Sequence, residues 1–198
     1  VDDAKRDTPD SDVKVYFYVE VNRVIDARKG RLRVSNGVLS AVNPDFVSYS
    51  SYEVLANDAS LSLTEALDEI QSKLRPKADL PERRVFIGEF GFPANRYDPD
   101  RQNAKSVDFI ETALAWGCPF VLYWEFYNNE VSNGKSVGFW MIDDQGRKQP
   151  IYDTYKKYYD YSTLFVRDFM LKQGRAPSGK EYAETMRHWI GGGATPAR

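Results

Sequence analysis

The sequence predicts an α/β fold with a parallel sheet, because segments typical of strands and of helices alternate along the chain. A run with strict two-residue alternation comes first, and further short apolar runs follow, separated by helices that carry their own start signals. The strands recur at intervals of about 35 to 40 residues, which is typical of βα units. We expect four such units, half of an eight-stranded βα barrel, followed by a C-terminal helical extension.

The expected strands are short segments rich in β-branched and aromatic residues. In the clearest of them, Phe17, Val19 and Val21 fall on one face, and Tyr18 and Glu20 fall on the other. This alternation is the two-residue period of a strand whose two faces meet different surroundings. The four expected strands cover 13–21, 45–49, 84–90 and 119–127.

Start and stop signals mark the expected helices. Ser62 and Glu65 form a capping box ahead of apolar residues at helical spacing, and Ser178 and Glu181 form a second one. Gly117 is placed to end a helix. The expected helices cover 62–74, 100–116, 151–173 and a last segment opened by Ser178. We therefore divide the chain into a (βα)4 half-barrel over 1–161 and a helical extension over 162–198, which ends in a flexible tail over 191–198.

The composition is that of a folded domain of nearly neutral charge. Of 198 residues, 42% are apolar, and 27 basic side chains face 29 acidic ones. The net charge of −2 argues against a nucleic-acid partner, and no apolar stretch reaches the ~18 residues that a membrane-spanning helix needs. Because Cys118 and His188 are the single cysteine and histidine, we expect no internal disulfide and no metal site with several His and Cys ligands. No metal and no cofactor is predicted.

Glu89 is the strongest candidate for chemistry. It lies at the end of an expected parallel strand, and Gly88 and Gly91 flank it. In βα barrels the active site lies at the carboxyl ends of the strands, and small neighbours allow a substrate to approach the backbone. The alternative is a carboxylate that only caps a helix or a loop after the strand, and the spacing alone favours neither interpretation.

Trp124 lies near the end of the next expected strand. An inward-facing side chain would place its indole beside Glu89, where an aromatic face can stack on the C–H face of a sugar. Filling the core is the commoner role of an aromatic residue in such a segment. In the inward arrangement Glu125 faces the other way, and Glu130 lies in the loop that follows.

These segments resemble the second half of a clan A glycoside hydrolase. The resemblance is carried by 85–91 with Tyr123-Trp124, by 45–52, and by the run Gly138-Phe-Trp-Met-Ile-Asp143. They are similar to the cellulase-like enzymes of family 5, which are retaining hydrolases on a TIM barrel. The resemblance covers about residues 13–159, excludes the C-terminal extension, and implies that the chain corresponds to strands five to eight of such a barrel.

The resemblance also implies roles for single residues. Glu89 matches the nucleophile at the end of the seventh strand, and Trp124 matches the eighth-strand tryptophan on the floor of the subsite that holds the attacked sugar. Tyr52 matches the sixth-strand tyrosine that hydrogen-bonds the nucleophile. Ser50 departs from the pattern, because many family members have histidine there, and this departure affects the assignment to a family rather than to the clan.

A retaining mechanism needs a second carboxylate, about 5–5.5 Å from the nucleophile, which protonates the leaving oxygen and later activates water. The resemblance places this acid/base in an Asn-Glu pair at the end of the fourth strand, ahead of the first strand expected here. Asn129-Glu130 lies in a loop after the last expected strand, so we expect the acid/base to be absent. Glu20, on the polar face with Tyr18, is expected to contact substrate or an arginine such as Arg23 rather than to transfer a proton.

Three functions remain open on the sequence. The first is part of a retaining O-glycoside hydrolase, acting on a polysaccharide or β-glycoside, which supplies the nucleophile and is inactive as an isolated chain. The second is a free-standing half-barrel that self-associates and is catalytically inert or only binds carbohydrate. The third is an unrelated α/β scaffold in which Glu89 is only structural.

The expected partners follow from the open side of a half-barrel. Interior residues would be uncovered, and the strands over 13–21 and 119–127 would be open edges, which proteins normally cover. We therefore expect carbohydrate as a ligand, and a second copy or a missing N-terminal half-barrel as the covering partner, with no membrane. Because the chain begins at Val1 without an apolar signal segment, we expect a processed or longer protein, and no compartment is predicted. The uncovered residues are expected to be Tyr16, Tyr18, Val85, Ile87, Phe120 and Leu122.

Overall fold

The computed structural model describes residues 6–7, 16–56 and 58–190. The chain divides into two compact units, Val1–Gly88 and Glu89–Arg198, which we call the first and the second unit. The fold is mixed α/β, with a three-stranded sheet, a two-stranded sheet and helices in both units. The start of the first expected strand, 13–15, and the expected tail, 191–198, lie outside the described residues.

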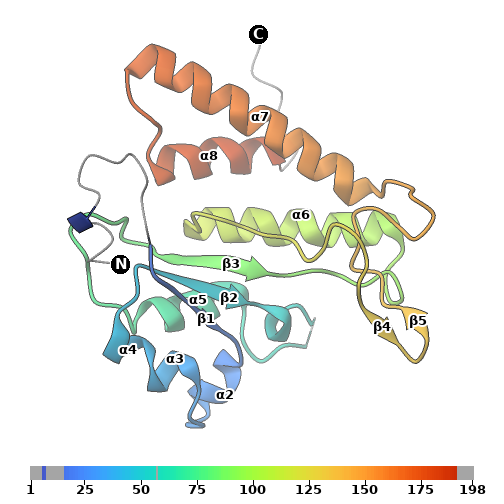
Figure 1. The fold of residues 1–198 in the computed structure, drawn as a ribbon, viewed down its shortest axis with the longest axis horizontal. Helices are drawn as coiled ribbons and strands as arrows, with labels where there is room; N and C mark the ends of the chain where they lie inside the picture. The colour runs from blue at the N-terminus through green and yellow to red at the C-terminus, as the bar shows by residue number, and fades with distance from the viewer. Residues whose placement is uncertain (1–5, 8–15, 57, 191–198) are drawn as a thin grey trace. The chain divides into compact units, whose positions relative to one another are not determined.

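The first unit is built on a parallel sheet in the order β1-β2-β3. Its strands are β1 (Tyr18–Val21), β2 (Phe46–Ser50) and β3 (Val85–Glu89), and the last residue of β3, Glu89, belongs to the second unit. β1 runs parallel to β2, with Glu20 opposite Ser48, and the three arrows point the same way in Figure 1. The sequence prediction of parallel strands is confirmed for these three segments.

The two faces of this sheet differ, as the two-residue period of a strand requires. Val85 and Ile87 are completely buried, with 0% exposure, whereas Tyr18 is 59% exposed. The expectation that Val85 and Ile87 line an uncovered face is therefore wrong. They belong to the buried face, and the alternation along β3 puts Phe86 and Gly88 on the opposite one.

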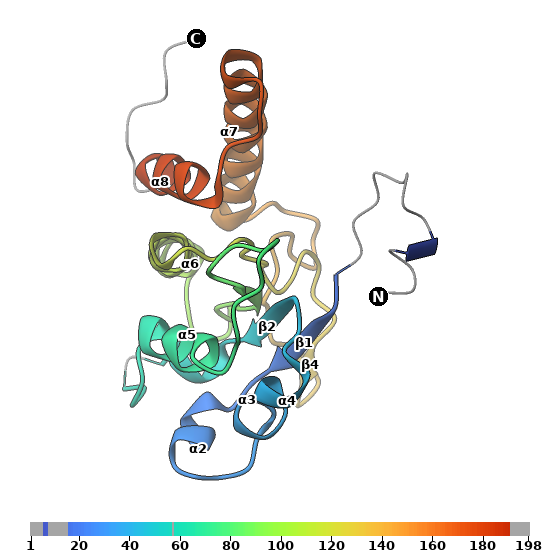
Figure 2. The same cartoon turned by 90° about the vertical axis from the view of Figure 1, so that its left-hand side faces the viewer.

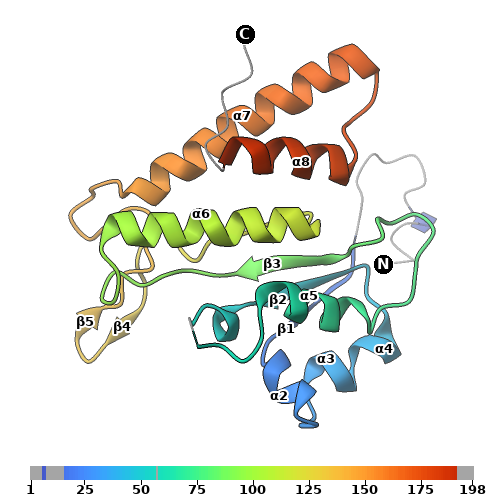
Figure 3. The ribbon, with the colours of Figure 1, turned by 180° about the vertical axis from the view of Figure 1, so that it is seen from behind.

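Short helices connect β1 to β2, and a longer one connects β2 to β3. The connections contain α2 (Val24–Arg28), α3 (Val34–Gly37), α4 (Leu39–Val42), the 3-10 helix η1 (Tyr52–Val54) and α5 (Leu63–Gln71), which Figure 3 shows from behind. The predicted capping box is present, because Ser62 Oγ accepts a hydrogen bond from the Glu65 amide and the Glu65 carboxylate accepts one from the Ser62 amide. Sequence analysis missed α2, α3 and α4, which are too short to show a helical period.

The side chain of Arg84, just before β3, makes hydrogen bonds to the loop that precedes β2 and to the loop that precedes β3. Its side chain is almost completely buried, and its guanidinium donates hydrogen bonds to the carbonyl oxygens of Pro44, Asp45 and Arg75 and to Asn43 Oδ1. A buried guanidinium is tolerated because its donors are satisfied in this way. One side chain therefore fixes two loops at the amino ends of neighbouring strands.

Three helices dominate the second unit. They are α6 (Pro99–Trp116), α7 (Pro150–Gln173) and α8 (Gly179–Ile190), and α8 lies beside both α6 and α7 in Figure 2. Gly117 ends α6 with φ of 103°, a left-handed conformation that favours glycine, as predicted. The second capping box is also present, and hydrogen bonds from the Arg175 side chain and then from Ser178 lower the pKa of Glu181 to about 2.

The fourth expected strand, 119–127, is not a regular strand. Its backbone donors go to two separate segments, since the Trp124 amide donates to the Phe90 carbonyl and the Glu125 amide donates to the Phe139 carbonyl. Such a division prevents a continuous ladder along one neighbour. The prediction of four βα units is therefore confirmed for three parallel strands and not for the fourth, although Phe120 and Leu122 are exposed as predicted.

A small antiparallel hairpin follows this segment, formed by β4 (Val131–Ser132) and β5 (Lys135–Ser136). Asn133 and Gly134 form its turn with φ of 52° and 72°, which is the two-residue turn that Asn-Gly favours. Sequence analysis did not predict this hairpin, although the Asn-Gly pair is a signal for it. None of the helices in the described residues is long and apolar enough to cross a membrane.

Replacing Arg84 tests whether its hydrogen bonds to the two loops stabilise the fold. Arg84→Met keeps most of the side-chain volume but leaves the buried carbonyl oxygens without their donor, so we expect the free energy of unfolding to fall by about 3 kcal/mol. Arg83→Met, at the neighbouring exposed position, is the control, with an expected change within about 0.5 kcal/mol. Urea unfolding followed by circular dichroism measures both, and equal losses in the two variants would contradict the assigned role.

Candidate functional site

Glu89 is the last residue of β3, at the carboxyl end of the parallel sheet, and its side chain is half-buried. Gly88 precedes it because a Cβ at that position would lie 1.8 Å from the Oγ of Ser48 on the neighbouring strand. Phe90 follows it and is fully buried, stacked on Phe109 of α6 with the ring centroids 4.3 Å apart. Both neighbours of Glu89 are therefore fixed by packing.

Trp124 reaches this strand end through its backbone. Its amide donates a hydrogen bond of 2.8 Å to the Phe90 carbonyl, and the next peptide bond, to Glu125, is cis. A Cβ on Gly91 would lie 2.2 Å from the Trp124 carbonyl oxygen, so the two segments touch at a distance that only glycine permits. The structure therefore brings the backbone of Trp124 against the two residues that follow Glu89.

The side chain of Trp124 is half-buried and has a defined partner. Its Nε1 donates a hydrogen bond of 2.8 Å to Oε1 of Glu130. The Glu130 carbonyl in turn accepts hydrogen bonds from the Asn128 side chain and from the Val137 amide. Sequence analysis placed Glu130 in the loop and gave it no role, because no local pattern indicates that a loop carboxylate folds back six residues to an indole.

Glu125, the neighbour of Trp124, has a different environment. It is buried, and its Oε1 accepts a hydrogen bond from the Asn129 amide. Its backbone bonds to Phe139 and Met141, which closes the loop that carries the hairpin. These contacts give Glu125 a role in holding the loop.

The remaining predicted site residues lie in the first unit. Tyr18 and Glu20 are on β1 and exposed, and the Tyr18 ring meets the Phe86 ring edge to face at 6.2 Å. Tyr52 begins η1, directly after β2, and is half-buried. The proximity of these three residues to Glu89 and Trp124, which belong to the second unit, stays a prediction.

Glu53, one residue after Tyr52, accepts three hydrogen bonds that the sequence did not predict. It accepts hydrogen bonds from the amides of Val24 and Ile25 at the start of α2, and from the hydroxyl of Tyr49 at 3.1 Å. Burial and then the Glu53 charge raise the pKa of Tyr49 far above its usual value. Tyr49 therefore stays protonated and donates to Glu53, which acts as the cap of α2.

The described residues contain no group of three or more His, Cys, Asp and Glu side chains that could hold a metal ion. The second unit therefore combines a half-buried carboxylate at a strand end, a tryptophan whose backbone contacts that strand end, and a second carboxylate that holds the indole. In general, a carboxylate can act as a nucleophile or as a hydrogen-bond acceptor, and an aromatic ring offers an apolar face.

Comparisons with known proteins give one weak similarity. Neither the protein-family models nor the curated proteins contain a match. Among solved structures, a protein described as a GH5_18 from Bifidobacterium longum subsp. infantis is similar, with a TM-score of 0.41 and 18% sequence identity. The similarity covers 73% of this chain and 30% of that one.

Gly91 provides a test of the contact between the strand end and Trp124. Gly91→Ala forces the new methyl group into the Trp124 carbonyl, so we expect the free energy of unfolding to fall by about 2–4 kcal/mol. Gly179→Ala is the matched control, because a Cβ there meets nothing within 4 Å, and it is expected to leave stability within about 0.5 kcal/mol. Denaturant unfolding followed by tryptophan fluorescence reads both stability and indole environment, and an unchanged Gly91→Ala variant would rule out the close approach.

Proposed function

We propose that this chain is part of a retaining O-glycoside hydrolase that acts on a polysaccharide or β-glycoside, with Glu89 as nucleophile and Trp124 as the platform for the attacked sugar. The observation that carries the proposal is the hydrogen bond from the Trp124 amide to the Phe90 carbonyl. It brings an aromatic residue to the carboxyl end of the strand that Glu89 ends, which is where βα folds place their chemistry.

The proposed reaction begins with attack by a Glu89 carboxylate oxygen on the anomeric carbon. A C–O bond to Glu89 forms while the bond from the anomeric carbon to the leaving oxygen breaks, and the leaving oxygen takes a proton from an acid. Water then attacks the same carbon, gives up a proton to the base, and releases Glu89 as a carboxylate. The sugar keeps its anomeric configuration because it is inverted twice.

The proposal assigns the acid/base role to no residue of this chain. Glu130, in the Asn-Glu pair of the loop, has one oxygen occupied by the Trp124 indole. Glu20 and Tyr18 are exposed on β1 and are proposed as substrate contacts, and Tyr52 is proposed as a hydrogen-bond partner of Glu89. The isolated chain should accordingly show no turnover of an ordinary glycoside.

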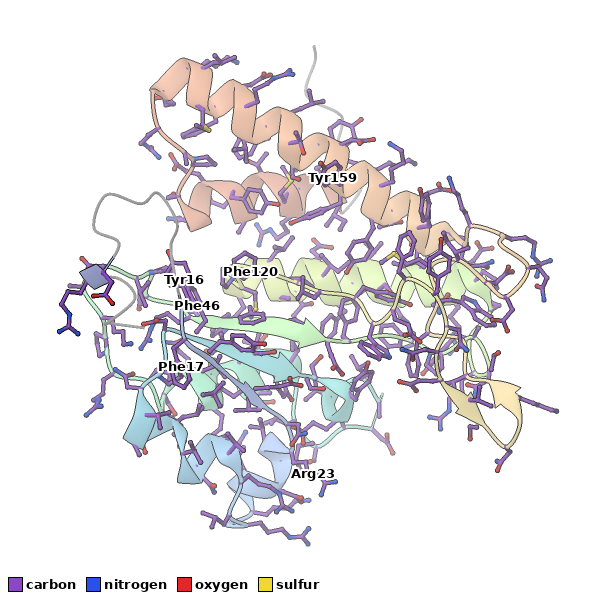
Figure 4. All side chains as sticks on the ribbon, viewed as in Figure 1. Tyr16, Phe17, Arg23, Phe46, Phe120 and Tyr159 are labelled. Atoms are coloured by element: carbon purple, nitrogen blue, oxygen red, sulfur yellow. The ribbon has the colours of Figure 1, made fainter. Side chains whose placement is uncertain are left out.

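A second candidate function is favoured by a specific observation. Aromatic side chains of the first unit lie near one another, and Figure 4 labels Tyr16, Phe17 and Phe46 among them. Tyr16 is 45% exposed, and its ring meets the Phe46 ring edge to face with the centroids 5.2 Å apart. Among the described residues β1 pairs with β2 alone, so it is an edge of the sheet. These features support a half-barrel that binds a second copy, or further βα units, over these aromatic side chains.

Covalent trapping tests the nucleophile without the missing acid. Dinitrophenyl 2-deoxy-2-fluoro-β-glycosides carry a leaving group that departs as a stable phenolate, so formation of the glycosyl ester needs no proton donor. We expect mass spectrometry of the intact chain to find one adduct, on the peptide that contains Glu89. Glu89→Gln should lose the adduct, and Glu111→Gln, on α6, should keep it. An adduct on another carboxylate, or none with any sugar, would contradict the assignment.

Analytical ultracentrifugation tests whether a second copy of the chain covers the exposed aromatic face of the first unit. We expect the chain to form a dimer, and Tyr16→Lys to weaken that dimer by about tenfold, because it places a charge among aromatic side chains. Tyr159→Lys changes an aromatic residue on α7 that is even more open to solvent than Tyr16, and it should leave the dimer unaffected. A compact monomer at all concentrations, or equal effects of both variants, would exclude self-association through this face.

A further inference from the structure

We propose that Glu130 is a saccharide-binding residue, which holds the Trp124 indole with one carboxylate oxygen and accepts a hydrogen bond from a sugar hydroxyl with the other. This inference rests on the proposed function, because it requires a sugar on Trp124. It adds a residue that neither the sequence pattern nor the resemblance indicates.

The first support is the position of the carboxylate relative to the ring. Trp124 Nε1 donates to Glu130 Oε1 at 2.8 Å, and an indole N–H points outward in the plane of the ring. Glu130 therefore lies at the edge of the indole and not over its face. A sugar can stack on the face while the carboxylate remains beside its rim.

The second support is the unused capacity of the carboxylate. In the part of the chain that the structure describes, Oε2 of Glu130 accepts no hydrogen bond, and no Lys, Arg or His side chain forms an ion pair with Glu130. An ionised carboxylate has acceptor sites on both oxygens. The partner of the Glu130 carboxylate is a neutral indole N–H and not a cation. The second carboxylate oxygen can therefore accept a short, strong hydrogen bond from a sugar hydroxyl.

The third support is that hydrogen bonds hold the backbone of Glu130 before any ligand binds, while the indole holds one oxygen of its carboxylate. The Glu130 carbonyl accepts from Asn128 Nδ2 and from the Val137 amide, each at 3.0 Å, and Asn128 Oδ1 accepts from the Gly138 amide at 3.0 Å. These bonds fix Glu130 at the base of the β4–β5 hairpin. A ring stacked on the indole presents its hydroxyls outward around its rim, so a fixed acceptor at the indole edge selects a ring with a hydroxyl on that side.

The test measures oligosaccharide binding by the full chain with calorimetry, using β-1,4-linked gluco-, manno- and xylotetraose as probes. For the probe that binds most tightly, we expect Glu130→Ala to raise Kd about tenfold, in line with the loss of a hydrogen bond to a charged group. Glu130→Gln should raise Kd less, while its amide oxygen still protects the indole N–H from hydrogen exchange. Asp144→Asn changes a carboxylate that accepts a hydrogen bond from Ser136 Oγ on the same hairpin, and it should leave Kd unchanged.

The same substitution in a chain that carries Trp124→Phe shows whether Glu130 contacts the sugar directly or only positions the indole. Trp124→Phe keeps an aromatic face and removes the N–H, so a Glu130 that touches the sugar should still matter there, with a similar rise in Kd on Glu130→Ala. If Glu130→Ala leaves Kd unchanged in the Trp124→Phe chain or in the unaltered chain, Glu130 does not contact the sugar. The proposal that the sugar stacks on Trp124 is unaffected by that result. If Trp124→Ala binds as well as the unaltered chain, or if no probe binds at all, the proposed function fails together with the inference.

Discussion

The hydrogen bond between the Trp124 amide and the Phe90 carbonyl is the contact on which the candidate site depends. It joins a strand end to a segment more than thirty residues away, and it is possible only because Gly91 leaves room for the Trp124 carbonyl. Phe90 is in turn fixed by stacking on Phe109 of α6. A carboxylate, an indole and the loop that holds the indole therefore depend on one backbone contact and one glycine.

Local signals in the sequence were sufficient to predict several elements of the two units. The two capping boxes, Gly117 and the alternation of β1 each describe an interaction between residues close in sequence, and the structure contains all of them. Glu89 at a strand end was predictable for the same reason, because a strand flanked by glycines is a local pattern. Its role as nucleophile stays a prediction.

Such local patterns could not predict contacts between segments that are far apart in the sequence. The segment over 119–127 has the composition of a strand, yet its backbone bonds are shared between Phe90 and Phe139, and no sequence period records that division. The side of the sheet that Val85 and Ile87 face was misassigned because two-residue alternation gives the period of a strand but not which face is buried. Glu130 was missed because its partner is an indole reached through a loop.

A crystal structure of the chain with a bound oligosaccharide is the decisive measurement for the proposed site. We expect a sugar ring stacked on the Trp124 face, with its anomeric carbon next to the Glu89 carboxylate and a ring hydroxyl donating to Oε2 of Glu130. A sugar bound elsewhere, or a Trp124 whose amide has left the Phe90 carbonyl, would contradict the proposed site.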